Sequence, residues 1–319
     1  MAKKINLTIY GISVLDKSNN RLNLNDMMGN GSFLEIIKKY AEDNMRKYSQ
    51  DPKKELIFQF DQVMLETIQN SKGQDEYDIL YGRVKTGEYG IESELMNIKT
   101  GDVYNRKKEQ ADMMPFGFCL AVPKGEVTHA VILLQSTGVF GMKLSLQSHL
   151  QKCLISINPD YNISFRAIAP KEYVDRYFNK GVLKKIRMIR YEIPEDISER
   201  AGLNYGVKQT KEERIIHKPL GFMERNAKKF QEWRVGQRSY TNIIEFDEFV
   251  YDDLKLEFSL EGTNKTFDLK DMDSLVVNEN ITKKVTQSGG HPIFSTLVPV
   301  MKSTAKEYLI GMGLLVPEK

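Results

Sequence analysis

Residues 116–122 read Phe-Gly-Phe-Cys-Leu-Ala-Val, and residues 130–135 read Ala-Val-Ile-Leu-Leu-Gln. Both runs are short and apolar, and Pro123, Lys124 and Gly125 interrupt the chain between them. Short apolar runs bounded by turn-forming residues are typical of β-strands. Because the connection is short, we expect the two strands to pair antiparallel. The chain is therefore expected to be built around a β-sheet.

Further β-rich runs precede this pair, at residues 56–68, 77–85 and 90–98. The connections contain turn-forming residues such as Ser71-Lys72-Gly73. Runs joined by short turns predict an antiparallel meander.

Two elements are expected before the meander. Residues 5–14 alternate between apolar and polar side chains, as a strand does. Ser32 and Glu35 have the spacing of a capping box, in which each side chain bonds a free backbone amide at the start of a helix. Apolar residues then recur at helical spacing, which predicts a helix over residues 33–48.

After residue 130 the pattern alternates between strands and helices. We expect helices at residues 142–154 and 170–181, and strands at residues 162–168 and 182–193. Crossovers of this length permit parallel pairing. The expected class is α/β or α+β, with residues 1–204 forming a mixed sheet in which the antiparallel meander is followed by a βαβαβ segment.

A polar, glycine-containing stretch at residues 202–214 marks the expected domain boundary. Residues 205–319 should form a smaller α+β part. Its expected elements are a basic helix at residues 221–234, an acidic β-hairpin pairing 251–260 with 263–269, and a C-terminal helix at 295–309.

The composition is that of a folded, soluble protein, with 319 residues, 41% hydrophobic and 28% charged. Cys119 and Cys153 lie in apolar surroundings without ligand-like spacing, which favours two buried, reduced thiols and a cytoplasmic location. The N-terminus lacks the apolar block of a signal peptide. The longest purely apolar run, residues 130–134, is too short to span a membrane.

Charge is sorted into blocks along the chain. Residues 166–190 hold eight basic and two acidic residues, a net charge of +6, and residues 208–238 hold nine and four, a net charge of +5. Residues 245–279 hold three basic and eleven acidic residues, a net charge of −8, although the whole chain carries only +3. Segregated charge of this kind indicates a polyanionic partner or an oriented protein contact.

Our first hypothesis is a protein that binds DNA or RNA through phosphates, without strong sequence readout. The expected contacts are basic residues of both positive blocks: Lys184, Lys185, Arg187, Arg190, Arg225, Lys228, Lys229, Arg234 and Arg238. Each block also has a simpler interpretation, since lysines protect edge strands and a basic helix face is often just solvated. Trp233, the only tryptophan, is either a core anchor or a platform for base stacking.

The second hypothesis is a metal-dependent nuclease on the same scaffold. Glu92 and Glu94 should share one face of the 90–98 strand and are weak candidate ligands. His291 is a further candidate, because the two glycines before it allow the backbone many conformations in which to position the imidazole. Such enzymes need clustered carboxylates and an assisting lysine. Gln135 ends the strand where an acidic-x-Lys pair would be expected, and that lysine is missing. No metal site and no cofactor are therefore predicted.

The third hypothesis is a structural or regulatory subunit whose complementary blocks dock on a partner or on copies of itself as a homo-oligomer. The general character suggests a bacterial accessory protein of a phage-defence or mobile-element locus, although no residue carries that expectation. No membrane partner is expected.

Overall fold

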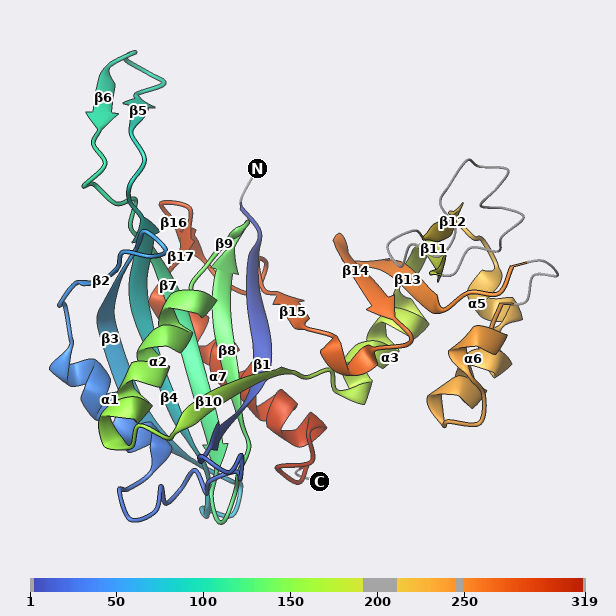
Figure 1. Cartoon of the computed structure of the whole chain (residues 1–319), viewed down its shortest axis with the longest axis horizontal. Helices are drawn as coiled ribbons and strands as arrows, with labels where there is room; N and C mark the ends of the chain where they lie inside the picture. Colours follow the sequence, from blue (N-terminus) through green and yellow to red (C-terminus); the bar gives the residue numbers. More distant parts are fainter. Residues whose placement is uncertain (1–2, 192–210, 245–248, 318–319) are drawn as a thin grey trace. The chain divides into compact units, whose positions relative to one another are not determined.

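The computed structural model describes residues 3–191, 211–244 and 249–317 (Figure 1). The chain forms two units, one from residues 1–168 and 276–319 and the other from residues 169–275. The boundary expected after residue 204 lies outside the described residues. The division differs from the predicted one because a strand at residues 277–280 and the C-terminal helix return to the N-terminal sheet instead of joining the second unit.

Unit 1 is built on a large sheet with the strand order β10-β1-β8-β7-β4-β3-β2. Strand β15 also pairs with β1, and β9 pairs with β8. The bounds are β1 (Ile5–Leu15), β2 (Ser49–Asp51), β3 (Leu56–Gln69), β4 (Asp75–Glu88), β7 (Met114–Pro123), β8 (Ala130–Thr137), β9 (Phe140–Gly141), β10 (Asn162–Ala167) and β15 (Val277–Asn280). The expected meander is present as β3, β4, β7 and β8.

The α+β class is confirmed, but the expected parallel pairing is wrong. Every paired strand of the described part of the chain runs antiparallel to its neighbours. The crossover after β8 does return the chain in the same direction, in β10. However, β1 lies between β8 and β10 and pairs antiparallel with both. The two parallel strands are therefore never neighbours.

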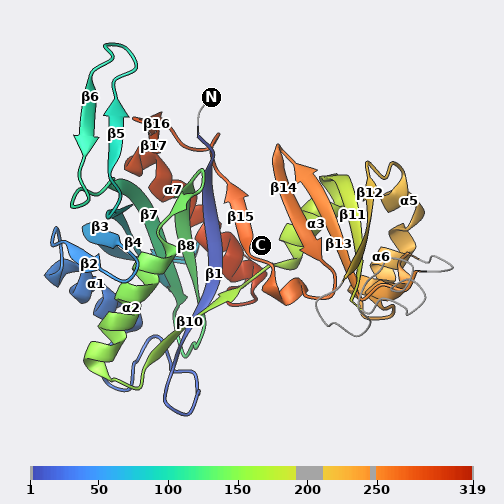
Figure 2. The ribbon, with the colours of Figure 1, turned by 45° about the horizontal axis from the view of Figure 1, so that its top comes forward.

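Both faces of the sheet are covered, which explains the continuous apolar runs of β7 and β8. Figures 1 and 2 show α1 (Phe33–Asp43) and α2 (Lys143–Ile157) on one face and α7 (Phe294–Gly311) on the other. Phe116 and Phe118 belong to the core beneath α1 and α2. Gly117 faces α7 so closely that a Cβ there would lie 2.5 Å from Leu297. The small residue lets α7 approach the sheet.

The predicted capping box is confirmed at the start of α1. The Ser32 hydroxyl accepts from the Glu35 amide, and the Glu35 carboxylate accepts from the Ser32 amide. The helix ends at Asp43, earlier than the predicted residue 48, since Arg46 adopts a left-handed backbone conformation with a φ of 58°. Cys119 and Cys153 are buried, free thiols, as predicted.

Two small hairpins leave the large sheet. Strands β5 (Ser93–Met96) and β6 (Val103–Arg106) pair only with each other in the described structure, where the sequence predicted one strand of the meander over residues 90–98. Strands β16 (Gln287–Ser288) and β17 (His291–Pro292) form the second hairpin.

Unit 2 is a four-stranded antiparallel sheet in the order β12-β11-β13-β14. Its elements are α3 (Lys171–Lys180), β11 (Val182–Arg190), β12 (Glu212–His217), α5 (Phe222–Arg225), α6 (Ala227–Arg234), β13 (Asp253–Leu260) and β14 (Thr263–Asp268), with single 3₁₀ turns at Tyr240–Asn242 and Met272–Ser274. The acidic hairpin is confirmed as β13 and β14. The predicted helix over 221–234 is broken at Asn226 into α5 and α6.

Helices α3 and α6 supply the aromatic core of unit 2. Phe178 of α3 contacts Phe230 of α6 and Phe258 and Phe267 of the hairpin, with ring centroids 4.9 to 5.7 Å apart. Among the described residues, no helix combines the length and the apolar character required to cross a membrane.

The stability of unit 1 should depend on pH through His149. Burial, helped by the charge of Lys152, lowers the pKa of His149 from 6.5 to about 4. Its ring stacks on Phe58, with centroids 4.2 Å apart. Between pH 6.5 and pH 4, His149 is therefore protonated in the unfolded chain and neutral in the folded protein.

We expect the free energy of unfolding to fall by roughly 2 kcal/mol as the pH drops through that window. Urea unfolding followed by far-UV circular dichroism measures it. His149→Phe, which keeps a ring against Phe58, should remove this component, whereas His217→Gln, at an exposed histidine, should leave it. Equal pH dependence in wild type and His149→Phe would contradict the assignment.

Candidate functional site

The positive and negative blocks of the sequence meet inside unit 2. Strand β11, from the first basic block, lies between β12 and the acidic strand β13. On the face of this sheet away from α3, Lys185 Nζ lies 3.2 Å from the Glu257 carboxylate of β13. Arg187 pairs with Glu213 of β12 at 2.6 Å. The block charge therefore serves, in large part, cross-strand pairing within the fold.

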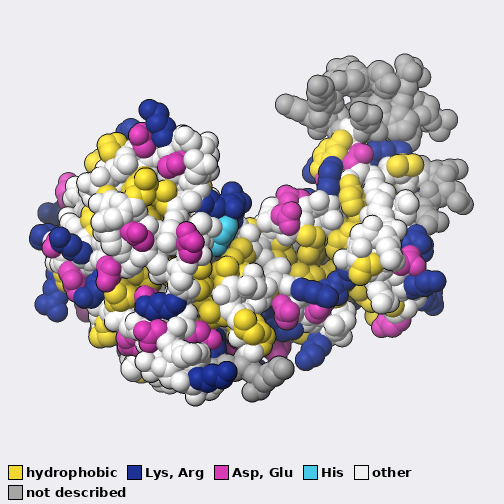
Figure 3. Space-filling view, turned by 90° about the horizontal axis from the view of Figure 1, so that it is seen from below, with side chains coloured by type: hydrophobic (Ala, Val, Ile, Leu, Met, Phe, Trp, Pro, Cys, Tyr) yellow, Lys and Arg dark blue, Asp and Glu magenta, His cyan; other side chains and the backbone are white. Residues whose placement is uncertain are grey.

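Four cations of the second block also have partners within the fold. Arg234 of α6 forms an ion pair with Asp175 of α3. Arg238 and Lys228 both approach Glu232, at 2.8 and 3.9 Å. Lys229 donates to a backbone carbonyl, that of Ile243. On the face shown in Figure 3, basic and acidic side chains are accordingly interspersed and form no single cationic field.

Arg190 is the most constrained of the predicted phosphate contacts. It is only 8% exposed, its guanidinium pairs with Glu212, and it lies over the ring of Phe249. Counting Arg190, six of the nine predicted contacts are within 4 Å of a carboxylate. The structure does not gather the nine side chains into one groove.

Three exposed cations lie at the start of β11 and in the chain that follows β12, and we call Lys184, Lys218 and Arg225 the Lys184 cluster. Lys184 lies at a β-bulge between Leu183 and Lys185, where the register with β13 shifts, and its side chain is exposed. The Lys218 amide donates to the Lys184 carbonyl at 2.8 Å. None of the three side chains has a carboxylate partner in the described part of the chain.

The cluster owes its form to local backbone features. A bulge adds one residue to a strand and redirects its side chain. Lys218 has a φ of 48°, and Gly221, with a φ of 72°, starts the short helix α5. The Arg225 side chain folds back toward Gly221, where a Cβ would lie 3.8 Å from its Nε. The chain after β12 thus turns at Lys218 and Gly221, and the Arg225 side chain lies against this turn at Gly221.

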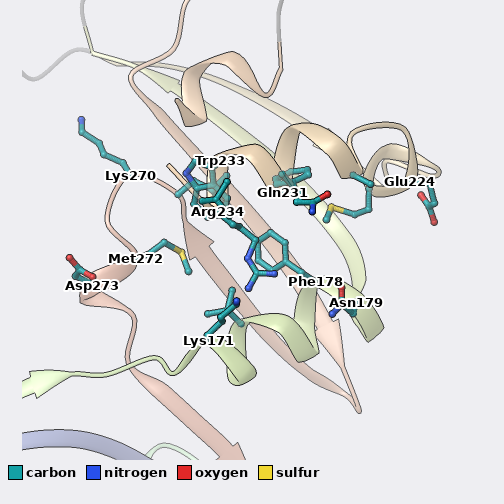
Figure 4. A pocket seen from close by; sticks show the side chains of 16 residues that line it. Lys171, Phe178, Asn179, Glu224, Gln231, Trp233, Arg234, Lys270, Met272 and Asp273 are labelled. Atoms are coloured by element: carbon teal, nitrogen blue, oxygen red, sulfur yellow. The ribbon is translucent and has the colours of Figure 1, made fainter. Parts of the chain in front are cut away.

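A groove opens between α3, α6 and the chain that follows β14 (Figure 4). Its cavity measures about 940 Å³. The apolar lining comes from Val174, Phe178, Met223, Ala227, Phe230, Trp233, Val235, Leu269 and Met272, and the charged lining from Lys171, Glu224, Arg234, Lys270 and Asp273. We call it the α3–α6 groove. Trp233 lines it with its ring stacked on Phe178, centroids 6.3 Å apart, so the tryptophan is both packed and partly accessible.

Two charged groups of the groove are fixed by partners. Arg234 is held by Asp175, as described above. Lys270 lies 3.0 Å from the buried Asp253, and this hydrogen bond raises the pKa of Lys270. Burial alone would raise the pKa of Asp253, but the hydrogen bonds from Tyr191 and Lys270 outweigh it and lower the pKa. Both ions therefore stay charged, and each largely compensates the other.

The nuclease candidates lie in separate places. Glu94 is in β5, while Glu92 precedes the strand, so they do not share a strand face as predicted, and both are exposed. His291 is in the small β17, and its buried Nδ1 has no hydrogen-bond partner among the residues that the structure describes. Gln135 accepts from the Gly117 amide and bonds Thr137, a structural role. Across the described residues, no three His, Cys, Asp or Glu side chains are grouped to hold a metal ion.

Comparison with known proteins adds no assignment. No family model matches the chain, and a search of curated proteins finds no match. Sequence reasoning missed the bulge at Lys184, which has no sequence signature. It also missed the pairing of β5 with β6, although the turn-forming residues Thr100-Gly101-Asp102 between them were a signal for this hairpin.

If the ion pairs between the charged blocks stabilise unit 2, removing one carboxylate should lower the free energy of unfolding. The loss should be larger where the basic partner of that carboxylate is more buried. Glu212→Gln leaves the buried Arg190 without its carboxylate and should cost about 3 kcal/mol. Glu257→Gln breaks the more exposed pair with Lys185 and should cost under about 1 kcal/mol. Urea unfolding followed by the fluorescence of Trp233, the single tryptophan, reports on unit 2. Similar small losses for both variants would contradict this account.

Proposed function

We propose that unit 2 binds nucleic acid weakly, through phosphates and without reading sequence, at the Lys184 cluster. The observation that carries the proposal is that Lys184, Lys218 and Arg225 lack a carboxylate partner among the described residues, whereas six of the nine predicted contacts have one. A cation without an internal partner can neutralise a phosphate and release its counterion at no cost in broken ion pairs.

The proposed site is smaller than the one expected from the sequence. It keeps Lys184 and Arg225 and adds Lys218, which lies between the two elements that carry them. Contacts to phosphate do not read the base. DNA and RNA are therefore both candidate ligands, and the affinity should be low, since few phosphates are neutralised.

The wider setting remains part of the proposal. The two buried thiols suit a reducing compartment, and we place the protein in the cytoplasm. A role as a bacterial phage-defence or mobile-element accessory protein stays a prediction. The nuclease alternative gains no observation from the described residues, and docking through the charged blocks would first require ion pairs such as Lys185–Glu257 to break.

Salt dependence gives the sharpest test. With three phosphates contacted, the slope of log K against log salt should lie between about −2 and −3. Fluorescence anisotropy with labelled single-stranded and double-stranded oligonucleotides, titrated at several salt concentrations, measures it. The triple variant Lys184→Gln, Lys218→Gln and Arg225→Gln should lose most of the binding.

The matched control changes the net charge equally at exposed lysines of unit 1: Lys53→Gln, Lys72→Gln and Lys283→Gln. It should bind like wild type. Binding that ignores salt, or equal losses in both triple variants, would overturn the proposal.

A further inference from the structure

The α3–α6 groove leaves part of an aromatic surface open to solvent. Its cavity of about 940 Å³ is in the size range of pockets that hold small organic ligands. Trp233 is only half-buried there, and its ring stacks on Phe178. Figure 4 shows both rings between α3 and α6, and Met272 on the chain that follows β14. An apolar group that enters the groove therefore meets an aromatic surface that the fold does not cover completely.

The ion pairs of the groove decide which charge it attracts. Arg234 and Lys270 are each held by a carboxylate, as described above, so their charges are largely compensated. The other charged lining residues are Lys171, Glu224 and Asp273, and none of them has an ion-pair partner among the described residues. One basic and two acidic residues give this uncompensated set a net charge of −1. Figure 4 shows the two acidic side chains at opposite ends of the groove.

A cation with an apolar body is complementary to both features. The face of an indole ring attracts a positive charge, and tryptophan does so better than phenylalanine or tyrosine. Glu224 and Asp273 supply carboxylates that no basic side chain of the described structure occupies. An organic anion gains only Lys171 and is repelled by both carboxylates. A neutral apolar molecule gains the contact with the rings but neither electrostatic contribution.

We infer that the α3–α6 groove binds a small organic cation with an apolar body, such as a substituted ammonium ion. The apolar body contacts Trp233 and Met272, and the positive charge is balanced by Glu224 and Asp273. Exposed carboxylates contribute modestly, so the preference for a cation over its neutral analogue should be roughly three- to tenfold. The inference goes beyond the proposed nucleic-acid binding and needs none of the Lys184 cluster.

The fluorescence of Trp233, the single tryptophan, reports directly on occupation of the groove. The probes are benzyltrimethylammonium, benzyl alcohol and phenylacetate, which share a phenyl ring and differ in charge. Each is titrated into the full chain at constant ionic strength. The ammonium probe should give a saturable change with the lowest dissociation constant, followed by the alcohol and then by phenylacetate. Tetramethylammonium, which has the charge without the ring, should bind more weakly than benzyltrimethylammonium.

A double variant assigns the preference to the two carboxylates. Glu224→Gln with Asp273→Asn should reduce the affinity for the ammonium probe to that for benzyl alcohol and leave the alcohol's affinity unchanged. The control, Glu126→Gln with Asp160→Asn, makes the same change of charge at exposed residues of unit 1 and should match wild type. Far-UV circular dichroism checks that both proteins are folded, and the charge series on wild type tests the inference even without them. The triple variant of the Lys184 cluster should keep the preference, which separates failure here from failure of the proposed function.

Three results would overturn the inference. The first is the absence of a saturable change with any of the ring-bearing probes. The second is binding of phenylacetate or benzyl alcohol as tight as that of the ammonium probe, which would make the groove an apolar site without a preference for cations. The third is an unchanged preference in the Glu224→Gln, Asp273→Asn variant, which would place the bound cation elsewhere.

Discussion

Unit 1 depends on the pairing of β1 with strands from the middle of the chain and from its C-terminal part. One edge of this strand pairs with β8 at Ile5–Ile12, while the other edge is shared by β15 at Asn6–Ile9 and β10 at Tyr10–Leu15. The alternating side chains Ile5, Leu7 and Ile9 are fully buried. Because β1 takes up the space beside β8, the strand that follows α2 cannot pair with β8 directly. This one placement makes the sheet antiparallel throughout its described strands and draws the C-terminal segment into the first unit.

The strand order of unit 2 is constrained by the charges on neighbouring strands. Strands β11 and β13 place Arg187 directly opposite Lys255, a like-charge pair that would be unfavourable alone. Each cation is compensated from the outer side, Arg187 by Glu213 of β12 and Lys255 by Asp268 of β14. The basic strand therefore needs acidic neighbours on both sides. The sorting of charge along the sequence follows from strand order, because each strand is one stretch of sequence.

Local signals in the sequence were reliable, and long-range ones were not. The capping box at Ser32 and the hairpin across Glu261-Gly262 depend on a few adjacent residues and were predicted correctly. The partners of Lys185 and Arg187 are 72 and 26 residues away, and pairing over such distances depends on strand order. Strict alternation along β11 would assign Lys184 to the face of Ile186, and the bulge at Lys184 breaks this alternation. For the candidate site, sequence composition therefore located the charged strands and helices of unit 2 but not the ion pairs that their side chains form.

A side chain can serve a partner only to the extent that its own fold leaves it unused. By that criterion most of the basic residues of unit 2 are committed, and net charge overstates the surface available to a polyanion. The Lys184 cluster is left over because a bulge and two left-handed residues carry it away from the acidic strands. The apolar β5–β6 hairpin is left exposed because β5 and β6 lie outside the large sheet. Both surfaces arise where the chain departs from regular pairing, and these are the places where a strand's hydrogen bonds and charges no longer specify its neighbours.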